Sequence, residues 1–80
     1  MKQAKRRRDI DAYITAKVKK LREEKGISQE KLAFHIGVSN SYVAQIESPK
    51  YRAKYNLYHL IDIIGLLECS PSEILPLEPH

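Results

Sequence analysis

Residues 27–47 read ISQEKLAFHIGVSNSYVAQIE, and this run predicts two short helices joined by a tight turn. Ser28 and Ser39 each stand where a side-chain oxygen can accept hydrogen bonds from the first free backbone amides of a helix. Gly37 ends the first helix, because glycine takes the positive φ that a side chain resists. Pro49 forbids continuation of the second helix. A turn this short makes the two helices cross steeply, so one face of the second helix stays free.

The segments on either side of this run predict two longer helices. Over residues 10–25 the apolar side chains recur at spacings of three and four, at Ile10, Tyr13, Ile14, Val18 and Leu21. After a loop over residues 48–55, Asn56 is a candidate cap for a very apolar fourth helix. We expect this helix to pack on the others through a wide stripe, formed by Leu57, Leu60, Ile61, Ile64, Leu66 and Leu67.

The end of the chain predicts a short fifth helix. Ser70-Pro71-Ser72-Glu73 is typical of a capping box with proline at the first helical position. No stretch shows the alternation of a strand, so we expect an all-α fold, a compact bundle of five helices. The expected division is a basic N-terminal arm (1–9), one domain (10–76) and a short tail (77–80).

The composition fits one small domain in a reducing compartment. Eighty residues can bury only a small core. The single cysteine, Cys69, excludes an internal disulfide, and no leader peptide is visible, so we expect a cytoplasmic protein. The longest apolar run, over residues 63–67, is far below the roughly 20 residues that span a bilayer, so we expect no membrane partner.

Positive charge is concentrated in two stretches. Residues 1–8 and 50–54 together hold eight Lys and Arg side chains and no acid, and without them the net charge would fall from +4 to −4. Residues 56–80 carry four acidic side chains and no Lys or Arg. The basic end therefore predicts a polyanionic partner, with a merely solvated tail as the alternative.

The second helix of the 27–47 run presents an uncharged polar face. At about 100° per residue, positions 40, 41, 44 and 45 share one side, opposite Val43 and Ile46. Asn40, Ser41 and Gln45 are donors and acceptors suited to base edges in the major groove of double-stranded DNA. Two alternatives stay open: Asn40 and Ser41 help to cap the helix, or Ser41 contacts a phosphate.

The order of these residues resembles the phage repressor and Cro type (XRE-like) of helix-turn-helix DNA-binding family. The resemblance covers most of residues 10–75 and rests on Ile27-Ser28-Gln29-Glu30-Lys31-Leu32-Ala33, Ile36-Gly37-Val38-Ser39 and the segment from Val43 to Glu47. It implies a lambda-repressor-like fold and base reading by the helix over residues 39–47. It also implies that Gln29 holds a backbone phosphate, and that Arg22 and Glu47 form a structural ion pair.

Further phosphate contacts are expected around this helix. Tyr42 is a candidate, with partial core packing as the alternative. The loop after this helix would pass beside the DNA strand, so its basic and tyrosine side chains are further candidates. The alternative is that this loop is simply exposed to solvent. The complete expected phosphate set is Gln29, Ser39, Tyr42, Lys50, Tyr51, Arg52 and Lys54. The arm, with Lys5, Arg6, Arg7 and Arg8, could track phosphates or enter a minor groove.

The sequence departs from the family pattern at two places. Ser48-Pro49 stands where many relatives have a glycine, which puts the phosphate contacts of the long loop in doubt. Ile64 and Leu66 replace small alanines, and Glu68 replaces a glycine, so we expect different packing around the fourth helix.

Other function classes fit less well. His35, His59 and His80 are scattered without further ligands at metal spacing, and no glycine-rich phosphate loop exists. We therefore expect no enzyme, no metal and no cofactor. The alternative function is a helical protein-interaction module, for example an antitoxin with a toxin partner.

The favoured hypothesis is a sequence-specific transcriptional regulator that acts as a repressor. One domain buries only about 600 to 1,000 Å² against DNA, so specificity calls for a homodimer on half-sites about 34 Å apart. Leu75 and Leu77 are the candidates for its interface, although Leu75 could equally belong to the core.

Overall fold

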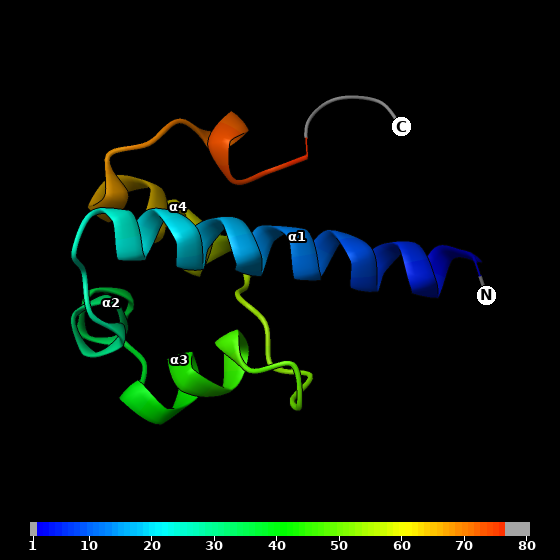
Figure 1. Cartoon of the computed structure of the whole chain (residues 1–80), viewed down its shortest axis with the longest axis horizontal. Helices are drawn as coiled ribbons and strands as arrows, with labels where there is room; N and C mark the ends of the chain where they lie inside the picture. Colours follow the sequence, from blue (N-terminus) through cyan, green and yellow to red (C-terminus); the bar gives the residue numbers. More distant parts are fainter. Residues whose placement is uncertain (1, 77–80) are drawn as a thin grey trace.

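Residues 2–76 fold into four α-helices and a single 3₁₀ turn (Figure 1). The computed structural model describes the backbone of residues 2–76 and the side chains of residues 9–76. The elements are α1 (Lys2–Glu24), α2 (Gln29–Ile36), α3 (Asn40–Glu47), α4 (Leu57–Leu67) and η1 (Pro71–Glu73). The described residues contain no strand, and the expected all-α fold is confirmed. The expected fifth helix is shorter than predicted: the capping box of Ser70 and Glu73 is present with Pro71 at the first position, but Pro71 and Pro76 leave room for only one 3₁₀ turn between them, so the bundle has four α-helices over the described residues.

The first helix is much longer than the sequence pattern predicts. α1 begins at Lys2 instead of Ile10, so the backbone of the expected basic arm is helical. Lys, Arg, Gln and Ala are good helix formers, and neither proline nor glycine interrupts residues 2–25. In Figure 1 the N-terminal half of α1 runs past the rest of the bundle. Tyr13 and Ile10 are consequently exposed, while Val18 is completely buried.

The predicted caps of the inner helices are confirmed. The hydroxyl oxygens of Ser28 and Ser39 accept hydrogen bonds from the backbone N–H groups of Lys31 (3.0 Å) and Tyr42 (3.1 Å). Gly37 adopts a left-handed conformation with φ of 78°, and the following N–H, of Val38, donates to the carbonyl of Ala33. The corner between α2 and α3 is therefore fixed by local hydrogen bonds.

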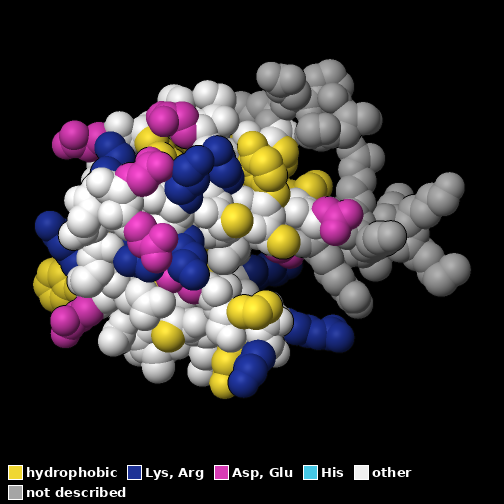
Figure 2. Space-filling model, in the orientation of Figure 1, with side chains coloured by type: hydrophobic (Ala, Val, Ile, Leu, Met, Phe, Trp, Pro, Cys, Tyr) yellow, Lys and Arg dark blue, Asp and Glu magenta, His cyan; other side chains and the backbone are white. Residues whose placement is uncertain are grey.

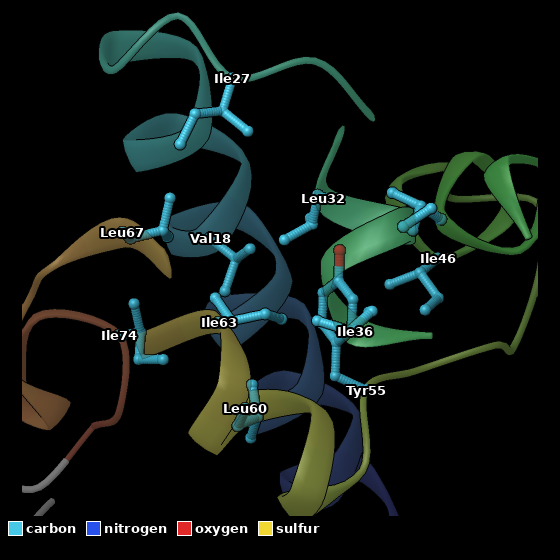
Figure 3. Close-up of a cluster of buried hydrophobic side chains, with 12 residues drawn as sticks. Val18, Ile27, Leu32, Ile36, Ile46, Tyr55, Leu60, Ile63, Leu67 and Ile74 are labelled. Atoms are coloured by element: carbon cyan, nitrogen blue, oxygen red, sulfur yellow. The ribbon is translucent and has the colours of Figure 1, made fainter. Parts of the chain in front are cut away.

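One cluster of buried side chains holds the helices together (Figure 3). α2 packs mainly on α3 and α4, and α1 crosses over both. The buried apolar residues are Val18, Ile27, Leu32, Ala33, Ile36, Val43, Ile46, Tyr55, Leu60, Ile63, Leu67 and Ile74. Leu75 is half-buried against this cluster, so it belongs to the core margin. No helix among residues 2–76 is long and apolar enough to cross a membrane.

The apolar stripe of α4 faces a different way from the one predicted. The buried residues are Leu60, Ile63 and Leu67, spaced three and four apart. Leu57 and Ile61, which the sequence analysis assigned to the core, are exposed. The error arises because α4 is apolar on nearly all sides, so hydrophobic spacing alone does not determine which side meets α1 and α2.

The family departures around α4 have local structural solutions. Glu68, which replaces a glycine, ends α4 in a left-handed conformation with φ of 52° and ψ of 45°. Ile64 and Leu66, which replace alanines, are half-buried against the core.

Candidate nucleic-acid interface

The outer face of α3 lies free at the edge of the molecule, at the bottom of Figure 1. Val43 and Ile46 bury its inner face. The three residues expected to read bases, Asn40, Ser41 and Gln45, are all exposed, together with Ala44 between them. The structure therefore brings the expected base-reading residues onto one uncharged, hydrogen-bonding surface.

The capping alternative for Asn40 and Ser41 is only partly supported. Ser39 is the N-cap of α3, and its hydroxyl also lies 3.2 Å from that of Ser41. Asn40 is the first residue of the helix and its exposed side chain takes no part in the cap. Its amide is thus placed to bind outside the chain, whereas the hydroxyls of Ser39 and Ser41 are already coupled to each other.

An ion pair between α1 and α3 fixes the C-terminal end of α3. Arg22 donates from Nε and Nη2 to the two carboxylate oxygens of Glu47, both at 2.9 Å, and from Nη1 to the carbonyl of Ile27 at 2.7 Å. The Glu47 side chain is only 3% exposed. The hydrogen bond to Glu47 raises the pKa of Arg22, an effect that burial opposes. The structural ion pair implied by the family resemblance is present, with the two-point geometry that favours arginine.

Gln29 belongs to the same cluster. Its Nε2 donates to Glu47 Oε1 at 2.9 Å, and the side chain is half-buried. The expected phosphate contact of Gln29 stays a prediction, and part of its amide is already used. The first backbone N–H groups of α2 point outward from the N-terminal end of the helix, so they can supplement a phosphate contact by Gln29.

Tyr42 anchors the loop that follows α3. Its hydroxyl donates to the backbone carbonyl of Lys54 at 3.3 Å, and its ring meets His59 edge-on. The side chain is half-buried, as the packing alternative expected. A phosphate contact by Tyr42 would have to break this hydrogen bond, because the hydroxyl has only one proton to donate and a phosphate oxygen can only accept.

The loop over residues 48–56 carries exposed cations beside α3. Lys50, Tyr51 and Arg52 are exposed, and Lys54 Nζ lies 3.7 Å from Asp11 of α1. In Figure 2, dark blue side chains project at the lower right, where this loop lies in Figure 1. Three of the expected phosphate-binding side chains are therefore free to reach outward, and that of Lys54 shares its charge with a carboxylate.

The expected contacts of the arm fall outside the described side chains. Lys5, Arg6, Arg7 and Arg8 lie in α1, but only their backbone is described. Their role stays a prediction.

Three structural residues were missed by the sequence analysis. His59 Nδ1 accepts from the backbone N–H of Asn56 at 3.2 Å, while Asn56 Oδ1 accepts from the N–H of His59 at 2.8 Å. Asn-x-x-His resembles a capping box, and this spacing could have indicated the pair. Tyr55 is buried in the core, and Asp11 pairs with Lys54. Nothing in the sequence indicates either contact, because the partners are far apart in the chain.

Comparisons with known proteins agree with this arrangement. Residues 18–74 match the family model for the helix-turn-helix, HTH_3. The structure is similar to the crystal structure of the restriction-modification controller protein C.AhdI from Aeromonas hydrophila. The two share 30% sequence identity with a TM-score of 0.67, over 84% of this chain and 97% of that one. No curated protein sequence matches the chain.

Proposed function

The chain belongs to the helix-turn-helix family and is a DNA-binding transcriptional regulator, and from this premise we propose that it is a repressor that reads the major groove with α3. One observation supports this most directly. Asn40, Ser41 and Gln45 form an exposed uncharged surface on a helix held from behind by the Arg22–Glu47 pair. Amide side chains on a rigid helix suit paired hydrogen bonds to adenine.

The surroundings of α3 support backbone contacts on both sides of the reading surface. The start of α2, with Gln29, offers backbone amides to a phosphate. The cations Lys50 and Arg52 stand on the other side. Such contacts position the helix without reading the sequence, and a repressor needs only to occupy its operator.

The active form that we propose is a homodimer in the cytoplasm, without a cofactor. A single α3 contacts too few base pairs to select one operator among many competing sites. Two copies on half-sites about 34 Å apart would supply the missing specificity. The alternative, a module whose main partner is a protein, is not favoured by any feature of the α3 surface.

The proposal is tested by selecting bound duplexes from a random pool and then measuring affinity for the selected site. Gln45→Ala should weaken binding by about 1 to 3 kcal/mol and relax preference at one base pair, because one paired contact is lost. Arg52→Ala is the matched control, since a phosphate contact carries no sequence information and its loss should weaken selected and random duplexes alike.

The same measurements can overturn the proposal. Both side chains are exposed, so neither change should alter folding. Unchanged affinity and unchanged preference in Gln45→Ala would remove α3 as the reading element. Absence of binding to any duplex at low salt would favour the protein-interaction module.

A further inference from the structure

A groove open to solvent lies between α1 and the loop that follows α3. Its volume is about 760 Å³. Residues of α1 between Asp11 and Lys19 line one side, and residues between Ile46 and Lys54 line the other. In Figure 1 α1 passes above this loop, and in Figure 2 the surface is recessed between the two. We call this feature the loop groove.

The size and the apolar lining of the loop groove suit a small flat molecule. Ala12 and Ala16 are exposed one helical turn apart, and their short side chains leave the α1 side open. Pro49 and Tyr51 line the loop side, and Tyr51 is 55% exposed. Small-molecule sites typically have volumes of about 300 to 1,000 Å³. An aromatic ring can pack on alanine and proline and against the face or edge of a tyrosine.

Three cations also line the groove: Lys19, Arg52 and Lys54. Among the described side chains, no carboxylate is in salt-bridge contact with Lys19 or Arg52. Lys54 Nζ lies 3.7 Å from Asp11, and both side chains are partly exposed. An anion in the groove would therefore find two uncompensated cations, and Arg52 can bind a carboxylate through paired hydrogen bonds.

The second carboxylate of the groove, that of Glu47, does not oppose an anion. Its side chain is only 3% exposed. Both of its oxygens accept hydrogen bonds from Arg22, and one of them also accepts from Gln29. The charge of Glu47 is thus neutralised inside the protein, and Asp11 is the one accessible carboxylate of the lining. The field in the groove is positive.

We propose that the loop groove binds a small aromatic anion, of the aromatic carboxylate type, and that this ligand opposes DNA binding. The ring lies on Ala12 and Ala16 beside Tyr51, and the anionic group meets Arg52 and Lys54. The proposed function assigns the same two cations to DNA phosphates, so ligand and duplex compete for them. Only this competition rests on the proposed function; the site itself does not.

The site is tested by titrating the full chain with naphthoate and following the backbone amide shifts by NMR. We expect saturable shifts centred on residues 11–19 and 46–54, with a dissociation constant of about 1 mM or lower for a ligand of roughly 13 non-hydrogen atoms. Acetate supplies the charge without the ring, and naphthalenemethanol supplies the ring without the charge. Each should bind at least about tenfold more weakly than naphthoate.

Two variants locate the ligand in the groove. Ala16→Leu fills the apolar side and should weaken naphthoate binding at least about tenfold. Leucine is a good helix former and the position is exposed, so the thermal midpoint should not fall. Lys19→Gln removes one lining cation and should weaken binding about threefold. Lys20→Gln is the matched control, because Lys20 is equally exposed on α1 but does not line the groove, and its loss should leave naphthoate binding unchanged.

Three results would each overturn the site: no saturable shift up to about 10 mM naphthoate, equal binding of acetate, or unchanged binding in Ala16→Leu. Naphthoate at saturation should lower the affinity for random duplex at least about threefold relative to acetate at the same concentration, which corrects for salt. Unchanged duplex affinity would overturn the competition. Duplex binding without naphthoate binding would overturn this inference and leave the proposed function standing, and naphthoate binding without duplex binding would do the reverse.

Discussion

The hydroxyl of Tyr55 is buried in the core, and among the described residues nothing accepts or donates a hydrogen bond to it. A buried hydroxyl without a partner costs about 1 to 3 kcal/mol of desolvation. Burial also raises the pKa of Tyr55, and the negative charge of Glu47 raises it further, while Arg22 lowers it. The ring of Tyr55 stabilises the core by packing, whereas its buried, unpartnered hydroxyl lowers the stability of the fold.

Replacing Tyr55 by Phe should therefore raise the free energy of unfolding by about 1 kcal/mol, measured by urea denaturation at neutral pH. Tyr42→Phe is the matched control. The hydroxyl of Tyr42 donates to the Lys54 carbonyl, so its removal should lower the free energy of unfolding by about 0.5 to 1 kcal/mol. Equal effects of the two changes on the free energy of unfolding would show that the Tyr55 hydroxyl has a hydrogen-bond partner after all.

The stability of the wild type and that of Tyr55→Phe should also differ at alkaline pH. The pKa of Tyr55 is higher in the folded chain, so the unfolded chain releases this proton first as the pH rises past about 10. Wild-type stability should fall above that pH by more than the stability of Tyr55→Phe falls. Parallel curves would show that Tyr55 ionises equally in both states.

At the scale of the elements, α1, α2 and α3 are joined by one polar cluster instead of by apolar packing alone. Arg22 satisfies both the carboxylate of Glu47 and the carbonyl of Ile27, and Gln29 adds a donor. Buried pairs of this kind add little net stability compared with apolar residues of similar size, but breaking one partner is costly. The cluster therefore serves mainly to orient α3.

Arg22→Met should lower the free energy of unfolding by about 3 to 5 kcal/mol, because the carboxylate of Glu47 is left buried and unpaired. Arg22→Met combined with Glu47→Leu should recover most of that loss, which a double-mutant cycle in urea measures. Purely additive losses in the double variant would show that the two side chains do not act as a pair.

The C-terminal end of α4 has a strained backbone conformation. Glu68 holds the left-handed conformation that glycine adopts without cost. Glu68→Gly should raise the free energy of unfolding by about 0.5 to 1 kcal/mol in thermal or urea unfolding. Glu68→Ala removes the charge but keeps the Cβ, so it is the control; an equal gain there would assign the effect to charge at the helix end.

At the scale of the whole molecule, the charge is strongly polarised. α1 begins with five cationic residues within residues 2–8, while the segment from residue 56 onward holds no Lys or Arg. The backbone of this part of α1 extends beyond the rest of the bundle in Figure 1. We therefore expect the electrostatic field of a duplex to favour an approach with the basic end first.

Changing Lys5, Arg6, Arg7 and Arg8 together to Gln should lower affinity for all duplexes and reduce the slope of log K against log salt by roughly 1 to 4. Each lost phosphate contact contributes about 0.9 to that slope. Glutamine preserves helix propensity, so α1 should remain intact. The slope is measured on selected and random duplexes; no change in it would leave the basic residues as solvated charge.

The local features of this protein were predictable from sequence because they depend on neighbours a few residues away. Ser28, Ser39 and Gly37 set the limits of α2 and α3 through hydrogen bonds that span at most five residues. The exposed side of α3 followed from helical periodicity and from its two apolar residues. The Arg22–Glu47 pair came from the family pattern.

The remaining features were decided by contacts between distant segments. α4 is apolar on nearly all sides, and only its packing against α1 and α2 determined that Ile63 is buried and Ile61 is exposed. Likewise, Tyr42 and Gln29 carry groups that can bind DNA or the chain itself, and the nearby Lys54 carbonyl and Glu47 carboxylate engage them. Sequence determines what a side chain can do with its neighbours along a helix, whereas tertiary structure determines which of several equivalent partners comes within reach.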